Sequence, residues 1–331
     1  MSMISSGMPV VITPSVLADT MVNGLTTDQA SLATTEQQVS TGDAINVASD
    51  NPAGAASMLQ LQGSVVRANQ YAANAADGVG WLSLGNSTVS SVLGVVQSIK
   101  SVIEGVSGSS LMSDPSTITS TAAQVQGALN QLVNLANTTE AGGQPIFAGT
   151  GNATQAYDAN GNYVGNSTAP TRTVAPGTKV AVAVTGPTVF GTGATGLLGT
   201  GVGPTGAAVT PGVLKQTYED LTNAASDLGA GNISGAKALL ANVTGADLTN
   251  LATALNNVET AAGTLGANQQ AVQGFSTQAT ASVTALTGQL GAVQDTNMAQ
   301  ALTNLQLQQT AYQEALYATS QLSTDSLVKY L

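Results

Sequence analysis

Apolar residues recur at alternating steps of four and three from residue 251 to residue 293, which is the longest regular pattern in the chain. Leu251 and Leu265 belong to this register, and Gln269 and Ser276 are its polar members. A heptad pattern of this length is typical of helices that pack as coiled coils. It predicts one long helix, roughly 65 Å at 1.5 Å per residue.

The register slips by one position after Val293 and then continues to Leu316, with Gln309 at one of its positions. No proline interrupts the chain here. The slip therefore predicts a local unwinding or a change of packing partner, rather than the end of a helix.

Three shorter repeats of the same kind lie in the first half of the chain. Gly42 ends the first, as glycine often does at a helix C-terminus, and Asp114-Pro115 separates the second from the third. The three predicted helical seams are Met21, Leu25, Leu32 and Val39; Leu82, Val89, Val92, Val96, Ile99, Ile103 and Val106; and Ile118, Ala122, Val125, Leu129, Leu132 and Ala136.

Residues 142–212 are rich in Gly, Thr, Pro and Val instead. Asn160-Gly161 between β-forming residues predicts a hairpin, and residues 179–184 alternate in the way of a strand. The segment predicts a small β-rich domain with a Gly-rich loop at 191–206, after which helix resumes near Val213.

These elements together predict a mainly α fold with a β-rich insertion (α+β). Apolar seams at both chain ends favour an elongated helical bundle formed by the N- and C-terminal segments, with the small β domain at its tip. The expected domains are an N-terminal assembly helix with a flexible leading segment (1–40), two halves of a helical rod (41–141 and 213–297), the β-rich domain (142–212) and a C-terminal assembly helix (298–331).

Composition limits the kind of core that the chain can form and the classes of partner that it can bind. Charged residues make up 8% and aromatic residues 3% of the 331 residues, which favours thin seams of Ala, Leu and Val over a thick aromatic core. The net charge of −11 argues against binding to nucleic acid or anionic membranes, because both rely on Lys and Arg. No run of 18 apolar residues is present, so no transmembrane helix is expected.

Few residues are candidates for enzyme chemistry. Cysteine and histidine are absent, which removes thiolate nucleophiles, the commonest general base and the usual zinc ligands. Adjacent Glu219 and Asp220 diverge on a helix and are expected on a solvated face, and the Gly-rich loop lacks the ending of a phosphate-binding loop. Asp43, Asp50 and Asn51 are better explained as a turn and helix cap than as a metal site. We expect no enzyme activity, no cofactor and no metal.

The terminal repeats are the remaining candidates for function. A lone helix pair with polar interruptions at Asp28 and Thr35 is marginal in isolation. We therefore expect both helices to complete their packing against neighbouring copies. The predicted assembly interface consists of Leu17, Met21, Leu25, Leu32, Val39, Met298, Leu302, Leu305, Tyr312, Leu316, Leu327 and Leu331.

Several motifs, taken in order, also carry a family resemblance. They are STGDAINVASDNP at 40–52, LVNLANTT at 132–139 with GQPIFAG at 143–149, GPTVFG at 186–191, VQDTNMAQAL at 293–302 and QQTA at 308–311. In this order they resemble the flagellin superfamily and, within it, the distal hook–filament junction proteins. Asp43 and Ala44 depart from the family, which usually carries basic residues there.

The resemblance implies an extracellular structural protein of the bacterial flagellum. Such an adaptor self-assembles into a ring through its terminal helices and joins the hook side to the flagellin filament. The implied partners are copies of itself, the proximal hook junction protein, flagellin, an export chaperone at the C-terminal helix and the type III export apparatus. Export would need no cleaved signal peptide.

Two alternatives stay open. The chain can be a flagellin that forms the filament itself or, in a different class, a type III secreted adhesin or ligand. The length of the chain, Pro52 and the motif at 143–149 favour the junction protein.

Overall fold

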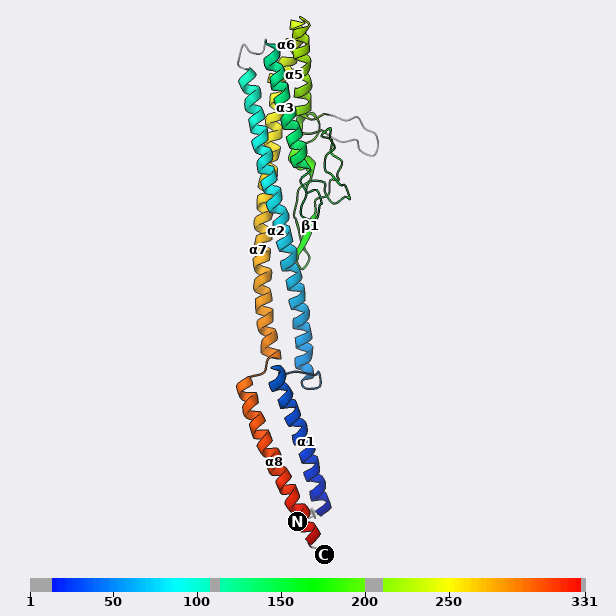
Figure 1. Cartoon of the computed structure of the whole chain (residues 1–331), viewed down its shortest axis with the longest axis vertical. Helices are drawn as coiled ribbons and strands as arrows, with labels where there is room; N and C mark the ends of the chain where they lie inside the picture. Colours follow the sequence, from blue (N-terminus) through cyan, green and yellow to red (C-terminus); the bar gives the residue numbers. More distant parts are fainter. Residues whose placement is uncertain (1–13, 108–113, 200–210, 329–331) are drawn as a thin grey trace, which may run out of the picture. The chain divides into compact units, whose positions relative to one another are not determined.

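The computed structural model describes residues 14–107, 114–199 and 211–328. They form two compact units: unit 1 holds the residues up to Val66 and from Val283 onward, and unit 2 runs from Arg67 to Ser282. The elements in Figure 1 are α1 (Pro14–Thr41), α2 (Pro52–Ser107), α3 (Pro115–Ala136), β1 (Thr171–Ala175), β2 (Thr178–Ala181), α4 (Gly186–Phe190), the 3-10 turn η2 (Gly193–Thr195), α5 (Val213–Gly229), α6 (Ile233–Asn242), the π-helix η3 (Val243–Asp247), α7 (Leu248–Gln294) and α8 (Met298–Val328).

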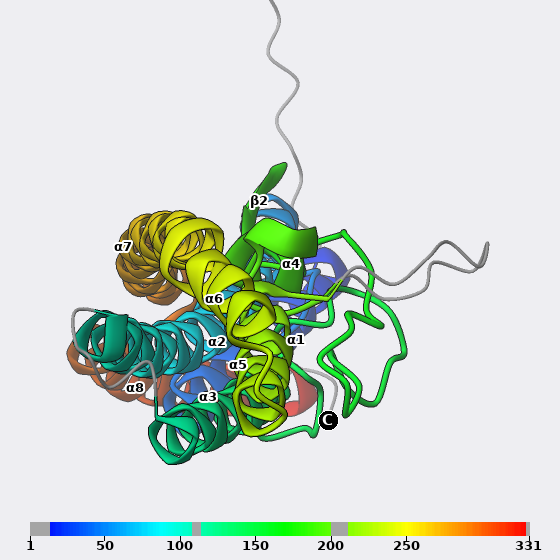
Figure 2. The same ribbon diagram turned by 90° about the horizontal axis from the view of Figure 1, so that it is seen from above.

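The predicted fold class, mainly α with a small β-rich insertion, is confirmed. The helical seams of unit 2 are buried as their repeats predict. All six predicted positions of α3 are buried, as are those of α2 from Leu82 to Ile103. On α7, Leu251, Val258 and Leu265 are buried as well. Seen end-on, the loops of the β-rich segment cover one side of these helices (Figure 2).

The register slip after Val293 marks the end of a helix, so this prediction was wrong. α7 ends at Gln294 and α8 begins at Met298. Asn297 caps the new helix, because its Oδ1 accepts a hydrogen bond from Gln300 N (3.3 Å). The short connection is stabilised by contacts to a distant segment of the chain, described below, and such contacts leave no mark on the local sequence.

The β-rich segment contains less regular strand than its sequence predicts. β1 and β2 form a two-stranded antiparallel sheet, in which Thr171 pairs with Ala181. Asn160-Gly161 lies in a tight turn where Gly161 has φ +77°, but only a single bridge, Tyr157 to Tyr163, accompanies it. The Asn-Gly signal thus predicts the turn correctly and overstates the hairpin.

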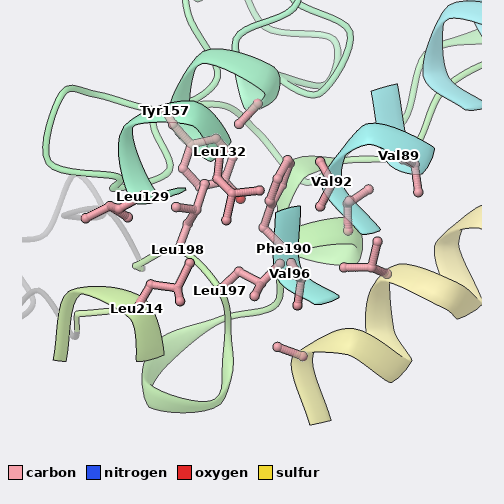
Figure 3. Packing of buried hydrophobic residues seen from close by; sticks show 14 of the residues in the cluster. Val89, Val92, Val96, Leu129, Leu132, Tyr157, Phe190, Leu197, Leu198 and Leu214 are labelled. Atoms are coloured by element: carbon pink, nitrogen blue, oxygen red, sulfur yellow. The ribbon is translucent and has the colours of Figure 1, made fainter. Parts of the chain in front are cut away.

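Aromatic residues gather in the β-rich segment. The core therefore does not consist only of thin seams of Ala, Leu and Val, as the composition predicted. Phe190 is fully buried, and its ring stands edge-on to Phe147 at 5.6 Å and to Tyr157 at 5.3 Å. Tyr163 tilts against Tyr157 at 5.2 Å. Figure 3 shows Tyr157 and Phe190 among the leucines and valines of the core. The low average aromatic content hides this local concentration.

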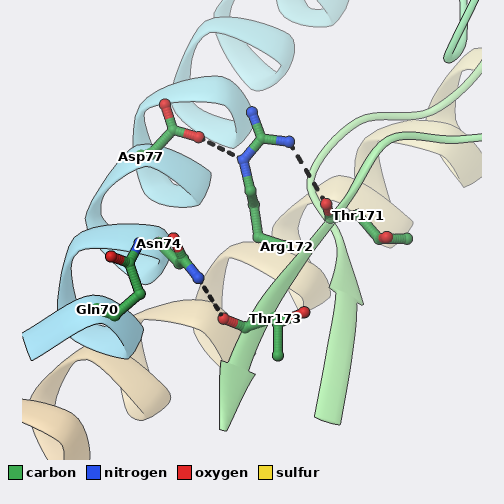
Figure 4. A network of polar contacts seen from close by, with 6 residues as sticks. All are labelled: Gln70, Asn74, Asp77, Thr171, Arg172 and Thr173. Atoms are coloured by element: carbon green, nitrogen blue, oxygen red, sulfur yellow. Dashed lines mark hydrogen bonds and ion pairs between the residues drawn. The ribbon is translucent and has the colours of Figure 1, made fainter. Parts of the chain in front are cut away.

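The β-rich segment lies on the flank of the unit 2 helices, rather than at a tip as expected. Asn74 Nδ2 donates a hydrogen bond to Thr173 O (2.8 Å), and Arg172 pairs with Asp77 at 2.5 Å (Figure 4). The Arg172 guanidinium also lies 5.4 Å from the ring centre of Trp81. These contacts attach β1 midway along α2, which continues to Ser107.

Replacing Arg172 with alanine is expected to lower the free energy of unfolding by about 1 kcal/mol, because a partly exposed ion pair and one cation–π contact are lost together. Urea denaturation measures this loss. Lys100→Ala is the matched control, since it removes the exposed pair with Glu104 within one helix and is expected to cost less than half as much. Equal losses in the two variants would contradict the role given to Arg172.

Candidate assembly surface

Helices α1 and α8 of unit 1 pack against each other over much of their length and run antiparallel (Figure 1). Met21, Leu25, Leu32 and Val39 of α1 are partly buried, and Thr35 between them is buried. The predicted register of α1 therefore faces α8, and the threonine that interrupts it is its most buried member.

The seam of α8 is different from the predicted one. Its partly or fully buried positions are Ala301, Leu305, Gln308, Tyr312, Ala315 and Thr319, again at steps of four and three. Only Leu305 and Tyr312 belong to the predicted register as well. Small and polar side chains at the other positions allow the two helices to approach. In the sequence, such residues mark a buried face less clearly than the neighbouring leucines mark theirs.

The larger apolar residues of the predicted register point to solvent. Met298 is 41%, Leu302 49% and Leu316 42% exposed. Their spacings of 4 and 14 residues are close to one and four full helical turns, so they share one face of α8 next to the seam. Of the other predicted residues, Leu331 and the side chains of Leu17 and Leu327 lie outside the described part of the structure.

Exposed apolar side chains are concentrated in unit 1. The large ones in the described residues of this unit are Val16, Val22, Val47, Leu59, Val66, Met298, Leu302, Leu307, Leu316 and Tyr317, against Val164 and Ile233 in unit 2. The heptad pattern did not point to Val16, Val22, Leu307 or Tyr317. A search for apolar residues outside the seam register would have found them.

Unit 1 has almost no core of its own. In its described residues the buried positions are Thr35, Ile45, Ala55 and Ala301, each still 5–7% exposed, whereas the large apolar cluster lies wholly within unit 2. A two-helix pair with this little burial is unstable alone in water. Its exposed apolar surface exceeds what single scattered residues explain, and such surfaces mark sites of association.

Charge does not offer an alternative to apolar contact. The described residues of unit 1 include eight acidic side chains, among them Asp28 and Glu314, and no lysine or arginine. Among the described residues, these segments therefore offer no cation for an ion pair between copies. These described segments offer apolar surface and hydrogen-bonding groups for association, and their like charges repel weakly in a way that salt screens.

Two loops of unit 1 join the helices at the end of the α1–α8 pair. Ala44 N donates to Gln294 O (2.6 Å) and Thr296 N donates to Gly42 O (2.8 Å). Gln294 Nε2 adds a hydrogen bond to Asp43 Oδ1 (3.1 Å), across 251 residues of sequence. These bonds fix where α7 ends and α8 begins.

The motif at 40–52 provides the first of these loops. Gly42 has φ +82°, which favours glycine after a helix. Asp50 Oδ2 accepts hydrogen bonds from Asn46 N and Val47 N, both 3.0 Å, and Asn51 Oδ1 caps α2 by accepting from Gly54 N (2.9 Å). The residues considered for a metal site thus act as the predicted turn and cap. The described residues contain no group of three metal-ligating side chains.

One described helix, Pro52–Gly105, is long and apolar enough to cross a membrane by composition alone. The prediction of no transmembrane helix did not single it out, since its apolar residues form no continuous run. Leu82, Val89 and Val96 of this helix lie in the core of unit 2.

The family is decided by two matches, at the two ends of the chain. Residues 12–152 match the model of the bacterial flagellin N-terminal helical region, and residues 248–331 match that of the C-terminal helical region. The chain belongs to the flagellin family. The two matched regions include α1, α2, α7 and α8, and the family therefore shares both helices of the α1–α8 pair.

Within the family, the chain resembles hook-associated proteins. It is 30% identical over 170 residues to flagellar hook-associated protein 3 of Salmonella typhimurium, which is 51% of this chain and 53% of the relative. The chain thus matches about half the length of this curated relative.

Solved structures share the fold. Flagellar hook-associated protein 3 of Legionella pneumophila superposes with a TM-score of 0.57 at 15% identity, covering 71% of this chain and 98% of that one. FlgL of Xanthomonas campestris gives 0.55 at 16% identity, covering 70% and 99%.

Proposed function

We propose that this chain is a structural protein of the bacterial flagellum, a junction adaptor between the hook and the filament. It self-assembles into a ring through α1 and α8 and joins the hook side to flagellin. The observation that carries the proposal is the coreless α1–α8 pair with its exposed apolar face. The resemblance to hook-associated protein 3 supports the place in the flagellum.

The proposed partners follow from this role. Copies of the chain cover the face of Met298, Leu302 and Leu316, which is 41–49% exposed in the single chain. The proximal hook junction protein and flagellin bind on the two sides of the ring. An export chaperone covers the C-terminal helix before assembly, because an uncovered apolar face aggregates. The chain leaves the cell through the type III export apparatus without a cleaved signal peptide, and it has no enzyme activity.

Antibody labelling of intact flagella tests the place of the protein. A single band at the hook boundary is expected, with flagellin released into the medium by a deletion strain. Labelling along the whole filament would instead identify the chain as a filament-forming flagellin. Labelling of the cell surface or medium without any flagellar band would identify a secreted adhesin or ligand.

A further inference from the structure

A buried acid lies where α5, α6 and η3 meet in unit 2. Asp247 ends the π-helix η3 and is only 2% exposed. Its Oδ2 lies 3.0 Å from Thr217 Oγ1, and this hydroxyl of α5 also lies 2.8 Å from Val213 O. Thr217 is itself 1% exposed, so bulk solvent does not reach this hydroxyl.

Counting protons shows which state of the acid fits. A threonine hydroxyl carries one proton, whereas a carbonyl oxygen and an ionised carboxylate can only accept. Thr217 Oγ1 can make both hydrogen bonds in full only if it donates to Val213 O and accepts a hydrogen bond from a protonated Asp247; beside an ionised carboxyl it donates to Asp247 Oδ2 and gives up the bond to Val213 O. Both distances are satisfied at once when the Asp247 carboxyl is protonated, whereas an ionised carboxyl takes the hydroxyl proton away from Val213 O.

The surroundings also disfavour a negative charge. Asp220 follows Thr217 by three residues on the same face of α5, and its Oδ2 is buried without a hydrogen-bond partner in the described structure. The expectation that Asp220 lies on a solvated face was therefore wrong. Burial raises the pKa of Asp220, and the neighbouring Glu219 raises it further, while a hydrogen bond from Asn242 lowers it.

No cation compensates for these acids. The other charged residues of the packed helices are Lys215 and Asp227 on α5 and Lys237 on α6. In the described part of the chain neither lysine forms an ion pair with Asp220 or Asp247. Burial raises the pKa of Asp247 to about 6, the charge of Asp220 adds to this, and the hydrogen bond with Thr217 opposes it.

We propose that Asp247 is a proton-operated latch: η3 packs on α5 while the carboxyl is protonated, and ionisation loosens this packing because it places an uncompensated charge in a site that is only 2% exposed. The element that opens is α6 with η3, a short helix and an irregular π turn that join α5 to α7. This latch belongs to unit 2 and does not depend on the proposed place of the chain in the flagellum.

The sign of the pH effect follows from linkage. A carboxyl whose pKa is higher in the closed state stabilises that state fully below the open-state pKa of about 3.9, and this contribution is lost as the pH rises through the closed-state value of about 6. The opening constant of α6 and η3 should rise about tenfold per pH unit in this window, about 100-fold in total, and then level off.

Hydrogen exchange of the whole chain tests the latch, with rates corrected for the intrinsic effect of pH. Protection of amides in residues 213–247 is expected to fall about 100-fold between about pH 4 and pH 7. Asp247→Asn supplies an amide donor to Thr217 at every pH and should keep protection high and constant. Glu259→Gln, an exposed acid on α7, is the matched control and should behave as the unmodified chain. Protection that is constant in the unmodified chain, or that falls equally in Asp247→Asn, overturns the proposal.

A second measurement can be made on the unmodified chain, and one variant extends it. The carboxyl carbon of Asp247, observed by NMR in aspartate-labelled protein, should titrate near pH 6, and Asp220→Asn should move this midpoint downward by removing a like charge. A midpoint near about 4, the value of an exposed aspartate, overturns the proposal.

Discussion

Replacing Leu302 and Leu316 with serine abolishes self-assembly of the chain and leaves unit 2 folded: this is the first expected result. Both side chains lie on one face of α8 and are 49% and 42% exposed in the single chain. Burying a leucine contributes about 1.5–3 kcal/mol. Since only about half of each side chain remains to be buried, losing two from each contact weakens it by about 1.5–3 kcal/mol, roughly 10- to 150-fold in the dissociation constant.

The same substitutions should hardly affect the folded chain by itself. Exposed side chains away from the core change stability by less than about 0.5 kcal/mol, and the apolar cluster of unit 2 contains neither residue. Leu305 is left unchanged on purpose, because it is partly buried in the seam with α1. Its substitution would mix loss of the helix pair with loss of the contact between copies.

Val164→Ser with Ile233→Ser is the matched control. These two residues are 46% and 58% exposed and lie in unit 2, so the control removes similar apolar surface elsewhere. Sedimentation of polymers formed by purified protein and attachment of filaments in cells measure the effect. Normal assembly of the Leu302 and Leu316 variant, or equal loss in the control, would reject this face as the interface.

The sequence predicts the helices of unit 2 well because their core is simple. Leu82 on α2, Val125 on α3 and Leu265 on α7 each belong to a heptad repeat, and all three are buried in the core of unit 2. Large apolar residues at regular helical steps form one apolar face on each helix, and these faces are buried by packing against one another. The turn at Asn160-Gly161 was predictable for a different reason, since its backbone conformation requires glycine.

The sequence predicts the contacts of unit 1 less well because several of them depend on weak local signals. Ala301 and Gln308 of α8 face α1, although Leu302 beside them is the stronger apolar signal. The break after Gln294 depends on hydrogen bonds to Gly42 and Ala44, about 250 residues earlier. No rule about local periodicity contains this information.

The acid latch was out of reach for the same reason. Asp247 belongs to no motif, and its neighbour Thr217 comes 30 residues earlier on another helix. Asp220 looked like a surface residue because it follows Glu219, which is exposed. Only the packing of α5 against η3 turns Asp220 inward. The evidence for this site therefore lies in the tertiary structure, and no local sequence pattern contains it.

Replacing Phe190 with alanine should produce the largest loss of stability, about 3–5 kcal/mol in the free energy of unfolding. The ring is fully buried on α4 and contacts Phe147 and Tyr157 edge-on. Such pairs contribute about 0.5–1.5 kcal/mol beyond their buried area. The chain has three phenylalanines in 331 residues. Phe147 and Tyr157 are themselves buried in the same cluster, so neither ring can refill the cavity without giving up its own packing.

Phe275→Ala is the matched control, because the third phenylalanine is only partly buried on α7 and lines an open apolar hollow with Tyr71 and Pro176. It is expected to cost less than half as much as Phe190→Ala, since its ring is already in partial contact with water. Urea unfolding measures both losses. Equal losses would show that the aromatic cluster is not the centre of the core of unit 2.

The Phe190 and Leu302 variants together separate folding from assembly. Phe190 lies in unit 2 and far in sequence from α1 and α8, so Phe190→Ala should lower the unfolding midpoint and still assemble below it. Leu302→Ser with Leu316→Ser should do the reverse, because unit 1 adds almost no buried side chains to the folded chain. If Phe190→Ala abolished assembly under conditions where it remains folded, the contact between copies would involve unit 2 as well, and the face on α8 would be only part of it.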